Sequence, residues 1–319
     1  MRHALTALAL ALGTATALTG GLLLSCAPPN DPGEATAGGG EKRSAPAESN
    51  ASERALLDRA DQLLVQRCMS RRGIPYWTVP RLSEEESRGV GYVLDDVAWA
   101  REYGYGGRLR YKELAAKRAD LNLIHRGKLT GQRLTEYTDA LYGGPDTPVL
   151  SVNVPSGGTI SSRLGGCHGT ALEELYGDRA TWFRVDKIAA NLTPLYAAEL
   201  RSDPRFRSAV TAWSRCMRSA GHPYPDPAAA HGAAAKATAP DAGTTPGSSD
   251  ERRAFAAEVR LAVAEATCAV NSGLGKTGRA LETEYRNKLD GVYLDALAEH
   301  AGIERRALAR ARDITGARP

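Results

Sequence analysis

The residues of this chain whose type and number first suggest chemistry are cysteines. Besides Cys26 near the N-terminus, the chain has four, which is an even count. Outside the cytoplasm such a count favours disulfides over free thiols. A redox-active pair is disfavoured because the chain has no C-x-x-C motif. The four residues are Cys68, Cys167, Cys216 and Cys268.

Two of these cysteines lie in a repeated pattern, R-C-M-x-x-x-G-x-P-Y, at residues 67–76 and 215–224. In both copies we expect the cysteine in the last turn of a helix, which glycine ends before an extended Pro-Tyr segment. If the repeat reflects a duplication, each half holds its own bridge. This interpretation predicts the disulfides Cys68–Cys167 and Cys216–Cys268. The alternative pairing is Cys68–Cys216 with Cys167–Cys268.

Aromatic side chains near glycine or proline, where the predicted helices end, are the only residues with binding potential. Exposed rings at such positions can stack on the sugars of a cell wall. In the alternative interpretation the rings pack over the helix ends and keep only their polar tips in water. The candidate ligand-contacting aromatics are Tyr76, Trp77, Tyr103, Tyr105 and Tyr224.

The chain contains no complete motif for binding a cofactor or a metal. The segment SGLGKT at residues 272–277 lacks the first glycine of a P-loop, since position 270 is valine. Cys167 and His168 match no zinc-ligand spacing, and G-x-S-x-G and H-E-x-x-H are absent. We therefore expect no cofactor, no metal and no catalytic residue. A glycosidase pair stays open as an alternative, because its two carboxylates can be distant in sequence.

The charge balance argues against a nucleic-acid partner. The full chain carries a formal net charge of +4, and residues 1–25 contribute only Arg2, so that +3 remains without them. Proteins that bind nucleic acid concentrate Lys and Arg on one face. The longest run of like charge here is acidic, the Glu triplet at residues 84–86.

The first 26 residues have the pattern of an export signal. Residues 1–3 include a positive charge, residues 4–24 are uncharged and rich in Ala and Leu, and Leu23-Leu24-Ser25-Cys26 follows. This end resembles the bacterial lipobox, which implies cleavage of signal peptide 1–25 and a diacylglyceryl group on Cys26. Two or more acyl chains such as palmitate would hold the protein on the extracytoplasmic face of the cell membrane. The alternatives are an uncleaved membrane anchor or a plain secretory signal.

Composition divides the rest of the chain. Residues 26–51 contain Pro, Gly, Ser, Ala and charged residues with no larger aliphatic side chain, which predicts a disordered tether. Residues 52–319 predict a helical extracytoplasmic domain with halves at about 52–177 and 181–300. Residues 226–249 are of low complexity, and we expect a disordered loop there.

Apolar periodicity predicts a mainly α fold with one small β-hairpin. β-branched residues on both sides of Pro155-Ser156-Gly157-Gly158 place the hairpin at residues 148–163. Pro194 is expected to kink a helix over 181–200, and Asp203-Pro204 to begin the next helix. The other predicted helices cover residues 52–72, 95–102, 111–120, 130–141, 167–176, 251–271, 277–300 and 303–313.

Several motifs together resemble a group of uncharacterised secreted lipoproteins of Streptomyces-like actinobacteria. They are the repeated C-M-x-x-x-G, DVAWAREYGYG at residues 96–106, GGC at 165–167 and W-x-x-C-M at 213–217. The resemblance covers most of the mature domain. It implies export and paired cysteines, and it implies no catalytic activity.

The resulting hypothesis is a non-enzymatic surface lipoprotein, anchored to the membrane through its lipid. Its expected partner is peptidoglycan or another envelope protein. The alternative, from a different class, is a cell-wall-acting hydrolase, which would need two converging carboxylates in a cleft.

Overall fold

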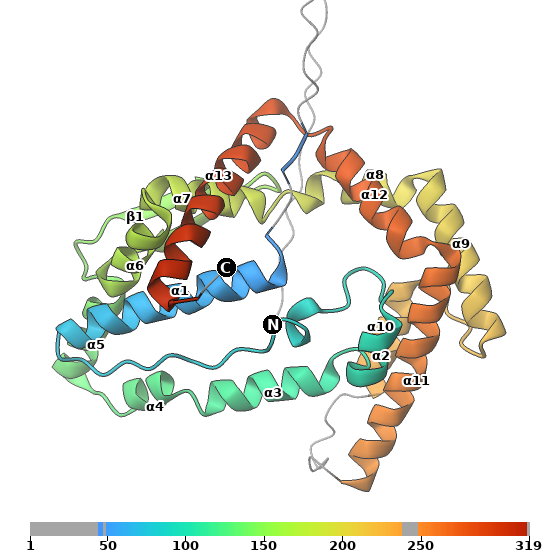
Figure 1. The fold of residues 1–319 in the computed structure, drawn as a ribbon, viewed down its shortest axis with the longest axis horizontal. Helices are drawn as coiled ribbons and strands as arrows, with labels where there is room; N and C mark the ends of the chain where they lie inside the picture. Colours follow the sequence, from blue (N-terminus) through green and yellow to red (C-terminus); the bar gives the residue numbers. More distant parts are fainter. Residues whose placement is uncertain (1–43, 47–48, 238–247, 318–319) are drawn as a thin grey trace, which may run out of the picture. The chain divides into compact units, whose positions relative to one another are not determined.

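The computed structural model of the chain describes residues 44–46, 49–237 and 248–317. These residues form a mainly helical structure with one antiparallel hairpin, which confirms the predicted fold class (Figure 1). In chain order the elements are α1 (Ala51–Arg71), η1 (Glu86–Arg88), α2 (Val97–Tyr103), α3 (Gly107–Arg118), α4 (Leu121–Gly127), α5 (Gly131–Tyr142), β1 (Val149–Asn153), β2 (Thr159–Arg163), α6 (Gly166–Tyr176), α7 (Arg179–Ala189), α8 (Thr193–Ser202), α9 (Pro204–Ser219), α10 (Pro227–Ala237), α11 (Ser249–Ser272), α12 (Leu274–Arg286) and α13 (Gly291–Thr315).

Local sequence signals explain where several elements begin and end. Asn50 and Glu53 form a reciprocal capping box at the start of α1, with both hydrogen bonds at 2.9 Å. Asp203 accepts a hydrogen bond of 2.8 Å from the backbone N–H of Arg205, and Pro204 begins α9 as expected. The hairpin pairs Val149 with Arg163 and Asn153 with Thr159, at the predicted place.

Two predicted helix boundaries are wrong. The helix expected over residues 181–200 is broken into α7 and α8, with Pro194 in the first turn of α8. Proline has no N–H to continue the preceding helix, so a break satisfies the backbone better than a kink here. The helix expected over 277–300 ends at Arg286, and α13 starts at Gly291 and continues to Thr315.

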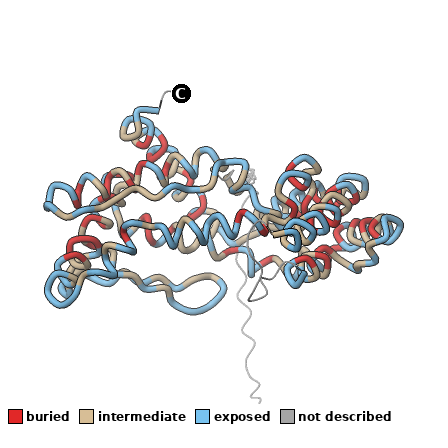
Figure 2. Tube along the Cα trace, turned by 90° about the horizontal axis from the view of Figure 1, so that it is seen from below, coloured by how far each residue is buried: buried red, intermediate tan, exposed pale blue. Residues whose placement is uncertain are grey.

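The first hydrophobic core forms around α1, α5, α6 and α13. Helices α1 and α13 lie side by side in Figure 1, although they are at opposite ends of the described chain. Leu57, Leu64 and Met69 of α1 share this core with Leu175 of α6 and Leu308 of α13. In Figure 2 the buried residues form stripes along the helices, which is the pattern of amphipathic packing.

The second core forms around α9, α10, α11 and α12. Trp213 and Met217 of α9 are fully buried there. Helix α2 packs against α11 through Trp99 and Ala100, next to Ala262 and Ala266.

These contacts correct the predicted halves 52–177 and 181–300. Helix α2 from the N-terminal half packs on α11, whereas α13 at the C-terminal end packs on α1, α6 and α7. Each hydrophobic core therefore contains helices from both predicted halves of the sequence. An apolar stripe shows which face of a helix is buried, but it does not specify the partner helix.

Each core contains one disulfide, in the predicted pairing. Cys68 is bonded to Cys167, and Cys216 is bonded to Cys268, both with Cα–Cα distances of 5.5 Å. The first bridge joins the end of α1 to the start of α6. The second joins the end of α9 to the last turns of α11.

The sequence repeat is also a structural repeat. Gly73 and Gly221 have φ angles of +70° and +83°, a left-handed conformation that glycine adopts without strain. Met69 and Met217 are fully buried at equivalent positions. The same hydrogen bonds close both helix ends: Ile74 N to Met69 O (3.0 Å) and His222 N to Met217 O (2.8 Å), Gln66 Nε2 to Tyr76 O (3.1 Å) and Ser214 Oγ to Tyr224 O (2.8 Å).

Two predictions of disorder are wrong in part. Residues 227–237 of the predicted loop 226–249 form α10, because Ala230 and Ala234 bury one face of an alanine-rich helix. Residues 44–46 and 49–51 of the predicted tether 26–51 lie on the domain, where the backbone N–H of Ala45 donates to Asn287 Oδ1 at 2.7 Å. Residues 238–247 are outside the described residues.

The signal peptide 1–25, Cys26 and residues 26–43 also lie outside the described residues. Within the described ranges, no helix is both long and apolar enough to cross a bilayer.

Candidate functional site

An extended strap between α1 and α3 places the first of the predicted aromatics, Tyr76. Figure 1 shows the strap, residues 74–82, running between α1 and helices α3 and α4. Gln66 Nε2 holds the Tyr76 carbonyl at 3.1 Å, and Gln62 Oε1 accepts from the backbone N–H of Val79 at 2.6 Å. These two α1 side chains fix the strap along one edge.

Asn122 of α4 fixes the other edge of the strap. Its Oδ1 accepts from the N–H of Trp77 at 2.9 Å, and its Nδ2 donates to the Trp77 carbonyl at 2.8 Å. The Trp77 ring meets His125 edge-on, with centroids 5.7 Å apart, and His125 in turn contacts the ring of Tyr137 at 5.6 Å. Trp77 therefore supports Tyr137 from behind, through His125.

A cleft of about 580 Å³ opens between the strap and helices α1, α3, α4, α5 and α6. Three tyrosines line it, Tyr76 from the strap and Tyr137 and Tyr142 from α5. We call it the tyrosine cleft. Its volume is in the range of about 300–1,000 Å³ that small-molecule sites occupy.

The floor of the tyrosine cleft contains Asp61 of α1 and His168 of α6. His168 stacks on Tyr142, with ring centroids 5.8 Å apart and planes 20° apart. Helix α6 can come this close to α5 because residue 166 is glycine. A Cβ there would lie 2.6 Å from the carbonyl oxygen of Ala140.

Two polar atoms on this floor have no hydrogen-bond partner among the described residues. They are Asp61 Oδ1 and His168 Nδ1, and both are buried. A buried polar group without a partner costs about 1–3 kcal/mol, and native proteins have few of them. A ligand with hydroxyl groups in the cleft would satisfy both atoms.

Burial sets the electrostatics of the floor. It raises the pKa of the Asp61 carboxyl above its ordinary value, against the opposing effect of His168. Burial, with smaller contributions from Tyr137 and Tyr142, raises the pKa of Tyr76 to about 12. Tyr76 is therefore a neutral phenol at physiological pH and is available as a hydrogen-bond donor.

Charged residues of both signs line the rim of the tyrosine cleft, and the acids among them are Glu113 and Asp120. Arg81 pairs with Asp58 at 2.9 Å, and Lys112 pairs with Glu86 at 2.6 Å. Two further cations that line the cleft, Lys117 and Arg126, form no ion pair within the described part of the chain. A ligand in the cleft would therefore meet charged donors from Lys117 and Arg126 and acceptors from Glu113 and Asp120.

The other three predicted aromatics lie away from this cleft. Tyr103 contacts the ring of Trp99 at 5.2 Å, and Tyr224 is half-buried against the second core. Tyr105 donates its hydroxyl proton to Glu265 Oε2 at 2.6 Å. The five predicted aromatics thus do not form one site, and only Tyr76 lines the tyrosine cleft.

Sequence reasoning missed four of the five residues that define the cleft and its floor: Asp61, Tyr137, Tyr142 and His168. The sequence contains two signals for this site. His168 follows Cys167 directly. Asp61 precedes Cys68 by seven residues, which places Asp61 and Cys68 on one face of a helix. The bridge Cys68–Cys167 therefore brings the carboxylate and the imidazole to the same side of the α1–α6 contact.

No protein-family profile, curated protein or solved structure matches this chain. Among the described residues, no three His, Cys, Asp or Glu side chains gather where they would hold a metal ion.

Proposed function

We propose that this protein is a lipid-anchored, non-enzymatic surface lipoprotein whose helical domain binds a cell-wall saccharide in the tyrosine cleft. The first 26 residues support export and attachment through Cys26, and two disulfides suit an oxidising location. The observation that carries the proposal is the pair of partnerless buried atoms, Asp61 Oδ1 and His168 Nδ1, on the floor of an aromatic cleft.

The chemistry of the cleft fits a sugar better than an apolar ligand. A hydroxyl group both donates and accepts, so neighbouring hydroxyls satisfy a carboxylate oxygen and an imidazole nitrogen together. Tyr76 and Tyr142 line the cleft, and aromatic rings can pack on the C–H side of a sugar. Lys117 and Arg126 add charged donors, and Glu113 and Asp120 add charged acceptors, for the hydroxyl groups of a saccharide.

Sedimentation with isolated peptidoglycan tests the proposal. The full-length protein, purified in detergent, should sediment with peptidoglycan, and Asp61→Asn and His168→Gln should each reduce the bound fraction about tenfold or more. Each variant removes a polar contact of about 1.5–3 kcal/mol. Asp61→Asn keeps the shape of the side chain, whereas His168→Gln also removes the ring that stacks on Tyr142. Soluble oligosaccharides of N-acetylglucosamine and N-acetylmuramic acid should compete.

Matched substitutions outside the cleft control for unspecific effects. Asp146 is an exposed aspartate and His222 is a histidine at a helix exit, and neither lines the cleft. Asp146→Asn and His222→Gln should sediment like the wild type. If the cleft variants also sediment like the wild type, or if no protein sediments, the proposed site is wrong and another envelope protein becomes the better candidate partner.

A wall-acting hydrolase is the second candidate, and one observation favours it. A buried carboxyl with a raised pKa, such as Asp61, is what a general acid requires. Glu113 and Asp120 also line the cleft and would supply the second carboxylate. Release of reducing sugar ends from peptidoglycan by the wild type, absent in Asp61→Asn, would establish hydrolysis and replace the non-enzymatic proposal.

A further inference from the structure

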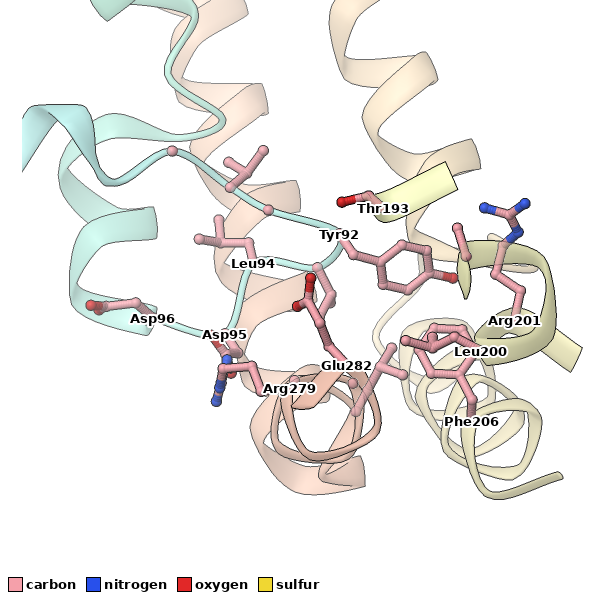
Figure 3. A pocket seen from close by; sticks show the side chains of 18 of the residues that line it. Tyr92, Leu94, Asp95, Asp96, Thr193, Leu200, Arg201, Phe206, Arg279 and Glu282 are labelled. Carbon is pink, nitrogen blue, oxygen red and sulfur yellow. The ribbon is translucent and has the colours of Figure 1, made fainter. Parts of the chain in front are cut away.

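A second cavity, of about 530 Å³, lies between the loop at residues 88–96 and helices α8, α9 and α12 (Figure 3). It shares no lining residue with the tyrosine cleft. Four aromatic residues line it, and the rings of two of them, Tyr92 and Phe206, are 5.1 Å apart. We call it the aromatic pocket. Its aromatic and large aliphatic residues are Tyr92, Trp99, Tyr196, Phe206, Leu94, Leu200 and Leu274.

Most charges at the aromatic pocket neutralise each other. Arg88 pairs with Asp96 at 2.6 Å, and Arg279 pairs with Asp95 at 2.7 Å. The charges that remain at the pocket are one anion, Glu282, and one cation, Arg201.

Glu282 of α12 and Arg201 of α8 form no ion pair within the described residues. Glu282 Oε1 accepts a hydrogen bond of 3.0 Å from the hydroxyl of Tyr196, and Glu282 and Arg201 are both exposed to solvent. In Figure 3 the ring of Tyr92 lies between the Glu282 carboxylate and the Arg201 side chain. The pocket therefore presents an exposed anion and an exposed cation that do not pair with each other, with the ring of Tyr92 between them.

We propose that the aromatic pocket binds a small zwitterion with an apolar body, an amino acid or a short peptide. Its ammonium group pairs with Glu282, and the nearby aromatic rings add cation–π attraction. Its carboxylate pairs with Arg201, and its apolar side chain packs on the ring of Phe206. A ligand with a single charge would leave one of the two protein charges uncompensated. The proposal does not rest on saccharide binding in the tyrosine cleft.

Isothermal titration calorimetry of the full-length protein in detergent tests the proposal, with L-leucine, L-phenylalanine and the dipeptide Leu-Leu as probes. At least one of these probes should bind. Tighter binding of leucine than of Leu-Leu would indicate a free amino acid as the ligand, and the reverse would indicate a peptide. N-acetyl-leucine lacks the ammonium group and leucinamide lacks the carboxylate. Each should bind about tenfold or more weakly, which is the typical effect of a lost charged hydrogen bond.

The protein variants should reproduce the loss selectively. Glu282→Gln should weaken binding of the zwitterions but not binding of N-acetyl-leucine. Arg201→Gln should weaken binding of the zwitterions but not binding of leucinamide. Two control variants, Glu199→Gln and Arg207→Gln, replace exposed residues of the same charges outside the pocket. Both should bind the probes as the wild type does.

Three outcomes would overturn the proposal. The first is that no probe binds, and the second is that leucinamide and N-acetyl-leucine bind as well as leucine. The third is that Asp61→Asn in the tyrosine cleft weakens zwitterion binding as much as Glu282→Gln does. Failure of saccharide binding alone leaves the inference intact, because the two cavities have no residue in common.

Discussion

Glu265 is a fully buried carboxylate in the second core, and three donors satisfy its oxygens. They are the N–H of Leu94 at 3.0 Å, Nε2 of His231 at 2.8 Å and the hydroxyl of Tyr105 at 2.6 Å. The donors come from the 88–96 loop, from α10 and from the residues after α2, so this single carboxylate on α11 holds three segments together.

This network predicts the effect of removing one hydroxyl. Tyr105→Phe leaves Glu265 Oε2 without its donor, and we expect a loss of about 1.5–3 kcal/mol in the free energy of unfolding, measured by urea denaturation. Tyr103→Phe is the matched control, because Tyr103 packs by its ring on Trp99, and it should cost less than about 0.5 kcal/mol. Equal losses in the two variants would contradict the role of the network.

The buried carboxyl of Asp61 predicts that the stability of the protein decreases as the pH rises. Burial raises its pKa in the folded state above the value in the unfolded chain. The folded protein then binds the proton more tightly, so ionisation destabilises the fold as pH rises from the ordinary Asp pKa of about 4. We expect Asp61→Asn to match the wild type most closely below about pH 4 and to melt at a higher temperature at neutral pH.

Thermal denaturation from pH 3.5 to pH 7 measures this difference, with Asp146→Asn as the control. A difference between Asp61→Asn and wild type that does not grow with pH would contradict the assigned cause. A stabilised Asp61→Asn that no longer binds saccharide would indicate that the chain keeps this carboxylate for binding and not for stability.

At the scale of elements, the disulfide Cys68–Cys167 lies next to the proposed saccharide site, because His168 follows Cys167. It closes a sequence separation of 99 residues, against 52 for Cys216–Cys268. Chain-entropy estimates give upper limits of about 4.7 and about 4.1 kcal/mol for the two bridges. Because His168 follows Cys167, only the first bridge positions the floor of the tyrosine cleft.

Two double variants separate these effects. Cys68→Ala/Cys167→Ala should lose both stability and peptidoglycan binding, whereas Cys216→Ala/Cys268→Ala should lose comparable stability but retain binding. The measurements are urea denaturation and sedimentation below the unfolding transition. Retained binding without the first bridge would contradict the positioning of His168 by Cys167.

Local signals in the sequence were sufficient for most elements. The Val-rich residues around Pro155-Ser156-Gly157-Gly158 predict the hairpin, and Asp203-Pro204 predicts the start of α9. In the alanine-rich residues of α10, low complexity predicts a loop, but the high helix propensity of alanine favours the helix that forms. Short α4 was missed, since its seven residues give too little periodicity.

At the scale of the whole described chain, the repeat predicted the two bridges but not the packing units. The geometry of each R-C-M-x-x-x-G-x-P-Y copy depends on residues that are close in sequence, so the sequence alone identifies both copies. The docking of α13 on α1 and of α2 on α11 depends on which stripes fit together in three dimensions. For the same reason the sequence analysis predicts only Tyr76 among the residues of the tyrosine cleft, which is built from six segments.

Location decides which ligands the cleft and the pocket encounter, and the location that we propose depends on lipidation of Cys26. Mass spectrometry of the native protein, extracted from membranes without reductant, tests it most directly. The account predicts a chain that begins at an acylated Cys26 and contains the bridges Cys68–Cys167 and Cys216–Cys268. A chain that begins at Met1, carries no lipid and has four free thiols would contradict it.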